Sequence, residues 1–245
     1  MSSSQFADQT PTQEVITDQT QESVSSQFET ISVLPLRNTV VFPSNVIPLV
    51  VERPSSIRLV DDALMGDRVI ALVALRNPEV ENPQPQDLYE VGVLAVIHRM
   101  ARDREGATLH LIVQGLDRIR IRAITQTEPY MRATFERAPE SVEEGVELEA
   151  LVRSLKDLFR RTMELTPHFP EEAVEAILET DDPTRLAYQV AANTRLSLEA
   201  RQELLELDDV SEKLRRLIDV FTRELEIQEL GQKIRDAAQS EIGDM

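Results

Sequence analysis

Few side chains in this sequence could carry out chemistry, and they do not gather into a catalytic pattern. A metal site needs several converging ligands, usually joined by carboxylates or thiolates, and the three histidines stand alone along the chain. Surface or packing roles are the favoured interpretation for each of them, so no metal ligand is predicted. These histidines are His98, His110 and His168.

Covalent and nucleotide chemistry are not predicted either. The sequence contains neither H-E-x-x-H nor G-x-S-x-G, and none of its three lysines directly follows a glycine, as a phosphate-binding loop requires. Lys156 and Lys213 fall off the apolar stripes of their expected helices, so both amines should stay solvated rather than be activated beside a serine. The sequence therefore predicts no catalytic residue and no cofactor-binding residue.

The charge distribution argues against a nucleic-acid partner. The chain has 26 basic and 44 acidic residues, a formal net charge of −18, and its acidic excess lies outside the neutral stretch 31–127. Arg118, Arg120 and Arg122 alternate along an expected strand and could grip phosphates, but a solvated strand face is the favoured interpretation. An acidic second half would repel a phosphate backbone; it could attract basic partners or simply confer solubility.

Several features suggest a cytoplasmic protein. Cysteine is absent, which fits a reducing compartment. No apolar run approaches the ~18 residues of a membrane span, and the acidic start of the chain resembles neither a secretory signal nor a transit peptide. Residues 1–30 are rich in Ser, Thr and Gln with isolated apolar residues, so we expect a disordered tail there.

The next hundred residues show the period of β-strands. Prolines at 35, 43 and 48 exclude a helix within residues 31–51, which should form extended chain with a bend. One helix is expected from Pro54 to about Gly66, because proline favours a first turn and glycine a helix end. Further strands are expected at residues 68–75, 91–102, 107–114, 118–123 and 130–135, the second and third joined by a turn at 103–106.

After Pro139 the apolar spacing changes to the helical period. A capping-box pattern at Ser141 and Glu144 predicts the start of a long helix that prolines at 167 and 170 stop. Short helices are expected at residues 171–179, 183–193 and 197–207, with Asp182 and Ser197 as N-caps. The last helix, about 209–238, is long enough to project from its bundle and could contact a partner.

Apolar side chains near expected loop tips are the most suggestive functional signal. Hydrophobic groups there could bind apolar ligands with little selectivity, and methionine is well suited to this because it is flexible and polarizable. The alternative, that some of them close the core, is equally favoured. The candidate substrate-binding residues are Phe42, Pro43, Val46, Ile47 and Met100.

Several ordered motifs give the chain a resemblance to the N-terminal domain of ATP-dependent Lon proteases. Residues 34–43 (LPLRNTVVFP) resemble that family's opening L-P-L-R-[ND]-x-V-x-[FL]-P run, and residues 87–93 (DLYEVGV) its D-L-[YF]-x-[VI]-G-[TV] strand entry. Residues 114–120 (QGLDRIR) resemble its [EQ]-G-x-x-R-[AV]-x element. The turn at 205–209 and the segment 226–234 (EIQELGQKI) resemble its bundle turn and the helix that leads into the ATPase module.

The resemblance implies an α+β fold in two parts. Residues 31–138 would form a small, β-rich, partly closed barrel with one helix, and residues 139–245 an all-α bundle ending in a long helix. The implied function is non-catalytic: recruitment of unfolded or damaged polypeptides through apolar surface, and assembly of a hexameric serine protease. ATP and Mg would bind only in the family's ATPase module, which this chain does not contain.

A second interpretation stays open at this point. Relatives reuse the same domain outside proteases, so the chain could be a stand-alone adaptor or ligand-binding protein. The gene downstream of Met245 distinguishes the two, because a phosphate-binding loop there supports the protease and a stop codon the adaptor.

Overall fold

The protein is described by a computed structural model in which residues 29–166 and 170–243 are placed. The expected tail at 1–30 lies outside these residues except for Glu29 and Thr30, which belong to the first strand. The elements in chain order are β1 (Glu29–Leu36), β2 (Val46–Val51), α1 (Pro54–Leu64), β3 (Val69–Ala74), the short 3-10 helix η1 (Pro85–Asp87), β4 (Val91–Arg102), β5 (Leu109–Gln126), β6 (Arg132–Arg137), α2 (Val146–Glu164), α3 (Glu171–Leu178), α4 (Pro183–Ala192), α5 (Leu198–Glu206) and α6 (Val210–Gly243).

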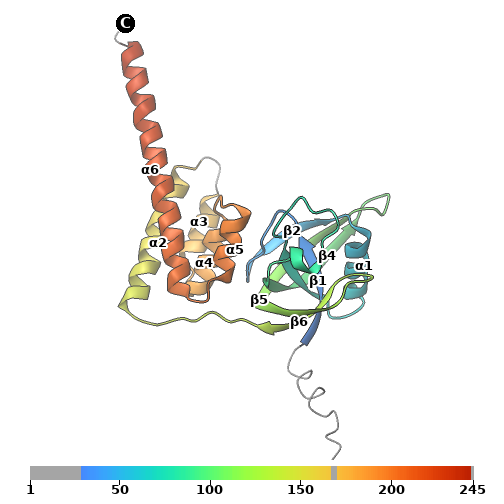
Figure 1. Ribbon diagram of the computed structural model, residues 1–245. Helices are drawn as coiled ribbons and strands as arrows, with labels where there is room; N and C mark the ends of the chain where they lie inside the picture. The colour runs from blue at the N-terminus through green and yellow to red at the C-terminus, as the bar shows by residue number, and fades with distance from the viewer. Residues whose placement is uncertain (1–28, 167–169, 244–245) are drawn as a thin grey trace, which may run out of the picture.

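The strands form the expected barrel, which is confirmed as an α+β fold with a helical unit beside it (Figure 1). Within the described residues the strand order is β2-β5-β4-β3-β1-β6, and β6 also pairs with β5, so five strands close a ring. Strand β5 makes this possible because it has 18 residues: its first part pairs with β2 and its second part with β6. The sequence suggested two strands here, whereas the chain continues through Gly115 as one.

Strand β2 is the exception to ring closure. Among the placed residues it pairs with β5 alone, in antiparallel register from Val46 opposite Gln114 to Val51 opposite Leu109. Helix α1 covers the barrel on the side where Leu49, Val51 and Leu111 point inward, and buries Leu59 and Val60 against them. The barrel is therefore partly closed, as expected.

The helical unit follows the predicted pattern except at its first helix. Asp182 and Ser197 are confirmed as N-caps, accepting hydrogen bonds from the backbone of Arg185 and Ala200. The predicted capping box is wrong, because α2 begins at Val146 and Ser141 instead forms a bridge with Asp209 at the start of α6. The Ser141 backbone N–H bonds the Asp208 carbonyl at 2.8 Å, which holds the link between the units against α6.

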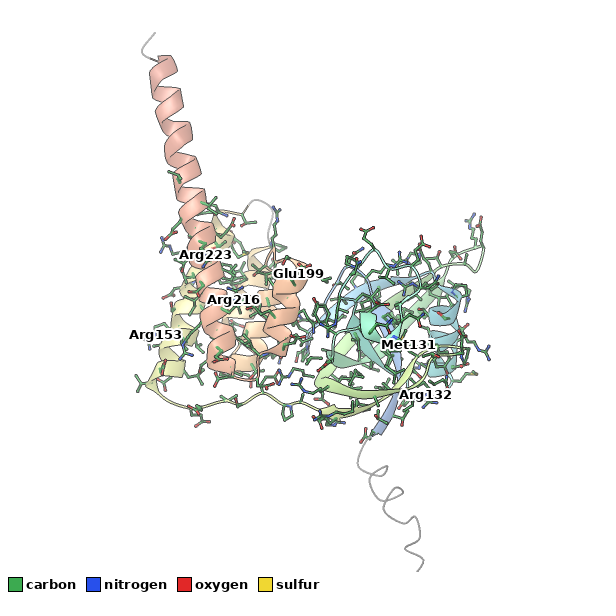
Figure 2. All side chains as sticks on the ribbon, viewed as in Figure 1. Met131, Arg132, Arg153, Glu199, Arg216 and Arg223 are labelled. Atoms are coloured by element: carbon green, nitrogen blue, oxygen red, sulfur yellow. The ribbon has the colours of Figure 1, made fainter. Side chains whose placement is uncertain are left out.

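The two units lie side by side, with α4 and α5 facing the barrel and α2 and α6 on the far side (Figure 1). Helix α6 runs well beyond its bundle, as predicted, and its exposed apolar residues there include Ile227 and Leu230. Charged side chains cover the helical unit, among them Arg153, Arg216 and Arg223 (Figure 2). Strand β6 ends at Arg137 and α2 begins at Val146, which brackets the predicted boundary at 138/139.

Candidate functional site

The structure does not place the five candidate apolar residues on one surface. Phe42 and Pro43 are buried, so the expectation that they are exposed at a loop tip is wrong. Ile47 is half-buried and packs against the barrel core. Val46 is 57% exposed and Met100 is 37% exposed. Whether any of them binds a substrate stays a prediction, and only Val46 and Met100 are freely accessible to one.

An apolar surface does exist on β2, and the sequence pattern predicts only part of it. Because side chains alternate along a strand, Val46, Pro48 and Val50 share the outward face, and all three are exposed. Val50 is the most exposed of them at 60%. The spacing of two in VIPLVV could have identified Pro48 and Val50, had the register of β2 been known. We call this set the β2 face.

Met100 lies on the opposite side of the sheet from the β2 face. It stands opposite Leu111, a residue whose side chain points into the core beside α1. The next residue on that side, Arg102, forms an ion pair with Asp61 of α1 at 2.6 Å. Met100 is therefore a separate apolar position at the end of the β4–β5 hairpin, and a ligand on the β2 face would not contact it.

Phe42 is buried because it joins the two units. Its ring stacks on Tyr188 of α4, with centroids 5.3 Å apart and planes 24° apart. The same core includes Val93 of β4 and Leu205 of α5, so one apolar cluster crosses from the barrel into the helices. Asn45 adds a hydrogen bond to the Tyr188 carbonyl at 3.4 Å. The residues at the apparent loop tip thus serve packing.

Arg118 occupies the centre of this junction, which contradicts its expected place on a solvated strand face. It is 3% exposed, and its guanidinium donates to the carbonyls of Leu205 and Leu207 at 3.0 and 2.7 Å. These carbonyls end α5, where a helix leaves acceptors unpaired and favours positive charge. Arg118 also donates to Ala138 O at 2.6 Å and to Asp208 Oδ1 at 2.5 Å. A barrel side chain thereby caps a helix of the other unit.

Lys213 is the second basic side chain at the end of α5, and the expectation that it is solvated is wrong. It is 1% exposed, and its Nζ donates to Leu204 O at 2.7 Å. Glu140 Oε1 lies 3.8 Å away and also accepts a hydrogen bond from the Tyr188 hydroxyl. Burial lowers the pKa of Lys213 to about 7 despite Glu140, and burial together with Glu140 raises the pKa of Tyr188.

This cluster of ionizable groups holds the two units together. Arg118, Lys213 and Tyr188 are all buried. Their hydrogen bonds go to the ends of α5 and the linker rather than to a nucleophilic hydroxyl. The perturbed pKa values therefore reflect a structural junction, a known alternative to a functional site.

Two other features lie away from this cluster, namely the histidines and a cavity. His98 Nε2 lies 2.7 Å from Gln114 Oε1 on an exposed strand surface, and His168 lies outside the described residues. In the part of the chain that is placed, no group of three His, Cys, Asp or Glu could hold a metal ion.

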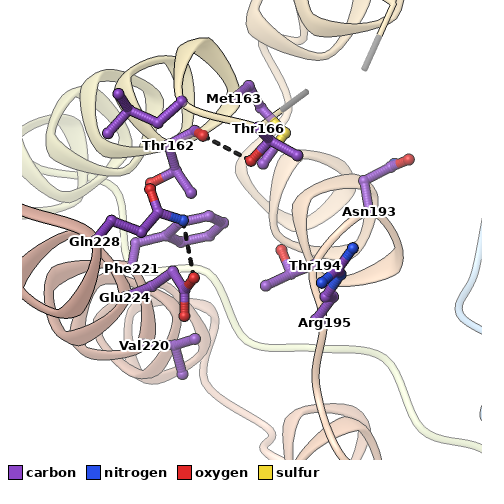
Figure 3. Close-up of a pocket in the computed structure, with 11 residues that line it drawn as sticks. Thr162, Met163, Thr166, Asn193, Thr194, Arg195, Val220, Phe221, Glu224 and Gln228 are labelled. Atoms are coloured by element: carbon purple, nitrogen blue, oxygen red, sulfur yellow. Dashed lines mark hydrogen bonds between the residues drawn. The ribbon is translucent and has the colours of Figure 1, made fainter. Parts of the chain in front are cut away.

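A cavity of about 380 Å³ opens between α2, α6 and the end of α4 (Figure 3). Met163 and Phe221 line it together with polar residues that include Thr194 and Glu224.

Two glycines explain parts of the sequence motifs. A Cβ at Gly115 would come within 2.2 Å of the Phe42 carbonyl oxygen, and one at Gly92 within 2.6 Å of the Leu72 carbonyl oxygen. Backbones approach so closely at these points that only glycine fits without a shift. Gly115 therefore fixes the segment that carries Phe42 to the strand that carries Arg118.

Comparisons with known proteins agree with this architecture. Residues 30–223 match the family model of the ATP-dependent protease La (LON) substrate-binding domain. The Lon protease of Dictyoglomus thermophilum is 44% identical over 214 residues, and Lon protease 1 of Herpetosiphon aurantiacus is 41% identical over 217. These matches cover 87% and 86% of this chain but only 27% and 26% of those proteins.

Solved structures show the same fold. The N-terminal domain of the Mycobacterium avium complex Lon protease superposes with a TM-score of 0.63 at 24% identity, covering 79% of this chain and 98% of that one. A Lon N-terminal domain protein from Xanthomonas campestris gives 0.56 at 19% identity, covering 78% and 98%. The predicted resemblance is confirmed: this chain belongs to the family of Lon protease N-terminal, substrate-binding domains.

Proposed function

We propose that this region recruits unfolded or damaged polypeptides for a Lon-type ATP-dependent serine protease, and that the β2 face makes the first contact. The observation that supports this role is the exposure of Val46, Pro48 and Val50 on a strand that has a neighbour on one edge only within the described part of the chain. Exposed contiguous apolar groups of this kind mark interaction sites. An unfolded chain offers apolar side chains to such a surface, whereas a folded protein has buried most of them.

The expected affinity is modest. Contact over about 300 Å² of apolar surface would contribute roughly 7 kcal/mol before losses, at ~25 cal/mol per Å². Ordering of the substrate and the loss of its translational freedom offset most of that gain. We therefore expect dissociation constants of about micromolar or weaker for one copy. Several copies in a hexamer would raise the apparent affinity by avidity.

The chemistry of proteolysis would belong to other parts of the assembled protein. This region would supply no catalytic group. ATP and Mg would bind in the ATPase module of the full-length protease. Helix α6, which carries Ile227 and Leu230 outside its bundle, supports a role in joining this region to that assembly. The proposed location is the cytoplasm; among the placed residues, no helix has the length and apolarity to cross a bilayer.

A titration of unfolded against folded protein tests the proposal. The chain should bind a reduced, unfolded substrate more tightly than its native form, with little change between low and high salt. Val50→Asp should weaken binding at least about fivefold, and Met65→Asp, at an exposed methionine beyond α1, should leave it unchanged. Met100→Asp tests the second apolar position. Normal binding by Val50→Asp and Met100→Asp, with both folded, would reject apolar capture.

A further inference from the structure

A groove of about 350 Å³ lies between the end of β1 and β2. Its sides are the end of β1 with residues 37–39, and β2 with the start of α1. Among the placed residues no ladder joins these two strands, since β1 pairs with β3 and β6 and β2 pairs with β5. Two strand edges thus face each other without a shared hydrogen bond.

The alternation of backbone hydrogen-bonding directions along β2 shows which of its N–H and C=O groups point into the groove. The Asn45 carbonyl accepts from Gly115 N–H at 2.9 Å, so odd-numbered residues of β2 face β5. Val46, Pro48 and Val50 consequently direct their backbone groups to the open edge. Pro48 supplies a carbonyl but no N–H, which leaves this edge able to pair with an added strand in only some registers.

Positive charge gathers at one end of the groove. Arg37 and Arg53 both line it. Burial, and to a smaller extent repulsion by Arg37, lower the pKa of Arg53. Within the described residues neither guanidinium has an acidic partner, and Arg37 donates only to the Glu81 carbonyl at 3.5 Å. The first turn of α1 beside them carries no acid. Glu52 also lines the groove, leaving a net charge of +1 in a chain of net −18.

We propose that residues 14–18 of this same chain, EVITD, dock in the groove as an added strand between β1 and β2, with Asp18 at Arg53 and Arg37. Three properties of this segment fit the site. Val15, Ile16 and Thr17 are β-branched and favour extended chain. Glu14 and Asp18 supply carboxylates, and the first 28 residues contain no Lys or Arg that the two arginines would repel.

The segment can reach the groove. Ten residues lie between Asp18 and Glu29, where β1 begins, and they span up to about 33 Å when extended. Strand β1 has 8 residues, about 26 Å, and it leads directly to the groove. A chain turning back from Glu29 along β1 meets Arg53 first, which places Asp18 there and Glu14 nearer Pro48. Tethering raises the local concentration to the millimolar range, so weak pairing is sufficient.

Disulfide trapping in the full chain tests this contact, because the natural sequence has no cysteine. The reporter pair is Thr17→Cys with Val50→Cys, and the matched control is Thr17→Cys with Met65→Cys, at a position 81% exposed but outside the groove. Under mild oxidation the reporter pair should close at least about tenfold faster than the control. Equal rates would overturn the proposal.

Charge variants test why the contact forms. Glu14→Lys with Asp18→Lys, which leaves the barrel untouched, should reduce trapping to the control rate, and adding Arg37→Glu with Arg53→Glu should restore it. Trapping that is insensitive to these changes would overturn charge-guided docking. Covalent dimers in place of intrachain closure would show that a second copy's tail is the occupant, which also overturns the proposal. None of these readouts depends on substrate binding, so they are independent of the proposed function.

Discussion

Arg118 offers the sharpest test of how the barrel is joined to the helices. Arg118→Met keeps the length and apolar stem of the side chain while removing the guanidinium that caps α5. The Leu207 carbonyl then loses the Arg118 donor in a buried place, Leu205 O keeps only Lys213 Nζ at 3.4 Å, and Asp208 keeps only Arg120 at 4.0 Å. The matched control is Arg122→Met on the same strand, where the side chain is 45% exposed and paired with Glu136.

The two substitutions should differ severalfold in cost. Removing one partner of a buried ionic network lowers the free energy of unfolding by about 3–5 kcal/mol. Each buried acceptor that is left unsatisfied costs roughly 1–3 kcal/mol. Some water will reach the carbonyls, so we expect the free energy of unfolding to fall by about 3–5 kcal/mol in Arg118→Met. An exposed ion pair contributes about 0.2–1 kcal/mol, which sets the expected loss in Arg122→Met.

Urea unfolding followed by far-UV circular dichroism measures both variants. Hydrogen exchange resolved by segment adds the location: α5 and the start of α6 should lose protection in Arg118→Met while β3 and β4 keep theirs. Equal losses in the two variants, or a loss in Arg118→Met below about 1 kcal/mol, would refute the reasoning that this guanidinium fastens α5 to the barrel.

Three further predictions concern the same junction. Lys213→Met should flatten the pH dependence of the free energy of unfolding. The pKa of Lys213 in the folded chain is about 7, below its ordinary value. Between pH 7 and 10 the lysine is therefore deprotonated in the folded chain but protonated in the unfolded chain. Unfolding then takes up a proton, so the wild type should gain about 1–2 kcal/mol from pH 7.5 to 9 relative to the variant, measured by urea unfolding at each pH. Gly115→Ala should lower the free energy of unfolding by about 3 kcal/mol or more, since its Cβ meets a backbone oxygen; a loss under 1 kcal/mol would contradict this. Phe42→Ala should cost about 3–5 kcal/mol and expose residues 138–145 to limited proteolysis, whereas unchanged cleavage would show that the ring does not join the units.

The sequence predicts the elements well because their signals are local. Proline at the start of α1, Asp182 and Ser197 at helix N-termini, and the apolar stripes of α2 and α6 each act through neighbours in the chain. The capping box at Ser141 failed for the opposite reason. Its backbone pairs with Asp208 and Val210, some 67 residues away, and this long-range contact takes precedence over the local pattern.

The same distinction explains the errors at the candidate site. Arg118 follows a strand pattern that predicts an exposed arginine, and the acceptors that hold it lie 87 and 89 positions further along the chain. Phe42 and Val46 have similar local surroundings, yet one faces α4 and the other faces solvent. Only the register of β2 on β5 and the docking of the helices separate them, and neither is encoded within a short window.

The length of β5 has a mechanical consequence. Residues 109–114 of this strand hold β2, and Arg118, four positions later, holds the end of α5 beside the first turn of α6. A force applied to a chain bound at β2 would act on one continuous strand. The force would be transmitted toward α6 through about 13 Å of covalent backbone, at ~3.3 Å per residue. The hydrogen bonds between β2 and β5 would share that load side by side. Tension at the β2 face would therefore reach the projecting helix without having to deform the apolar core of the barrel.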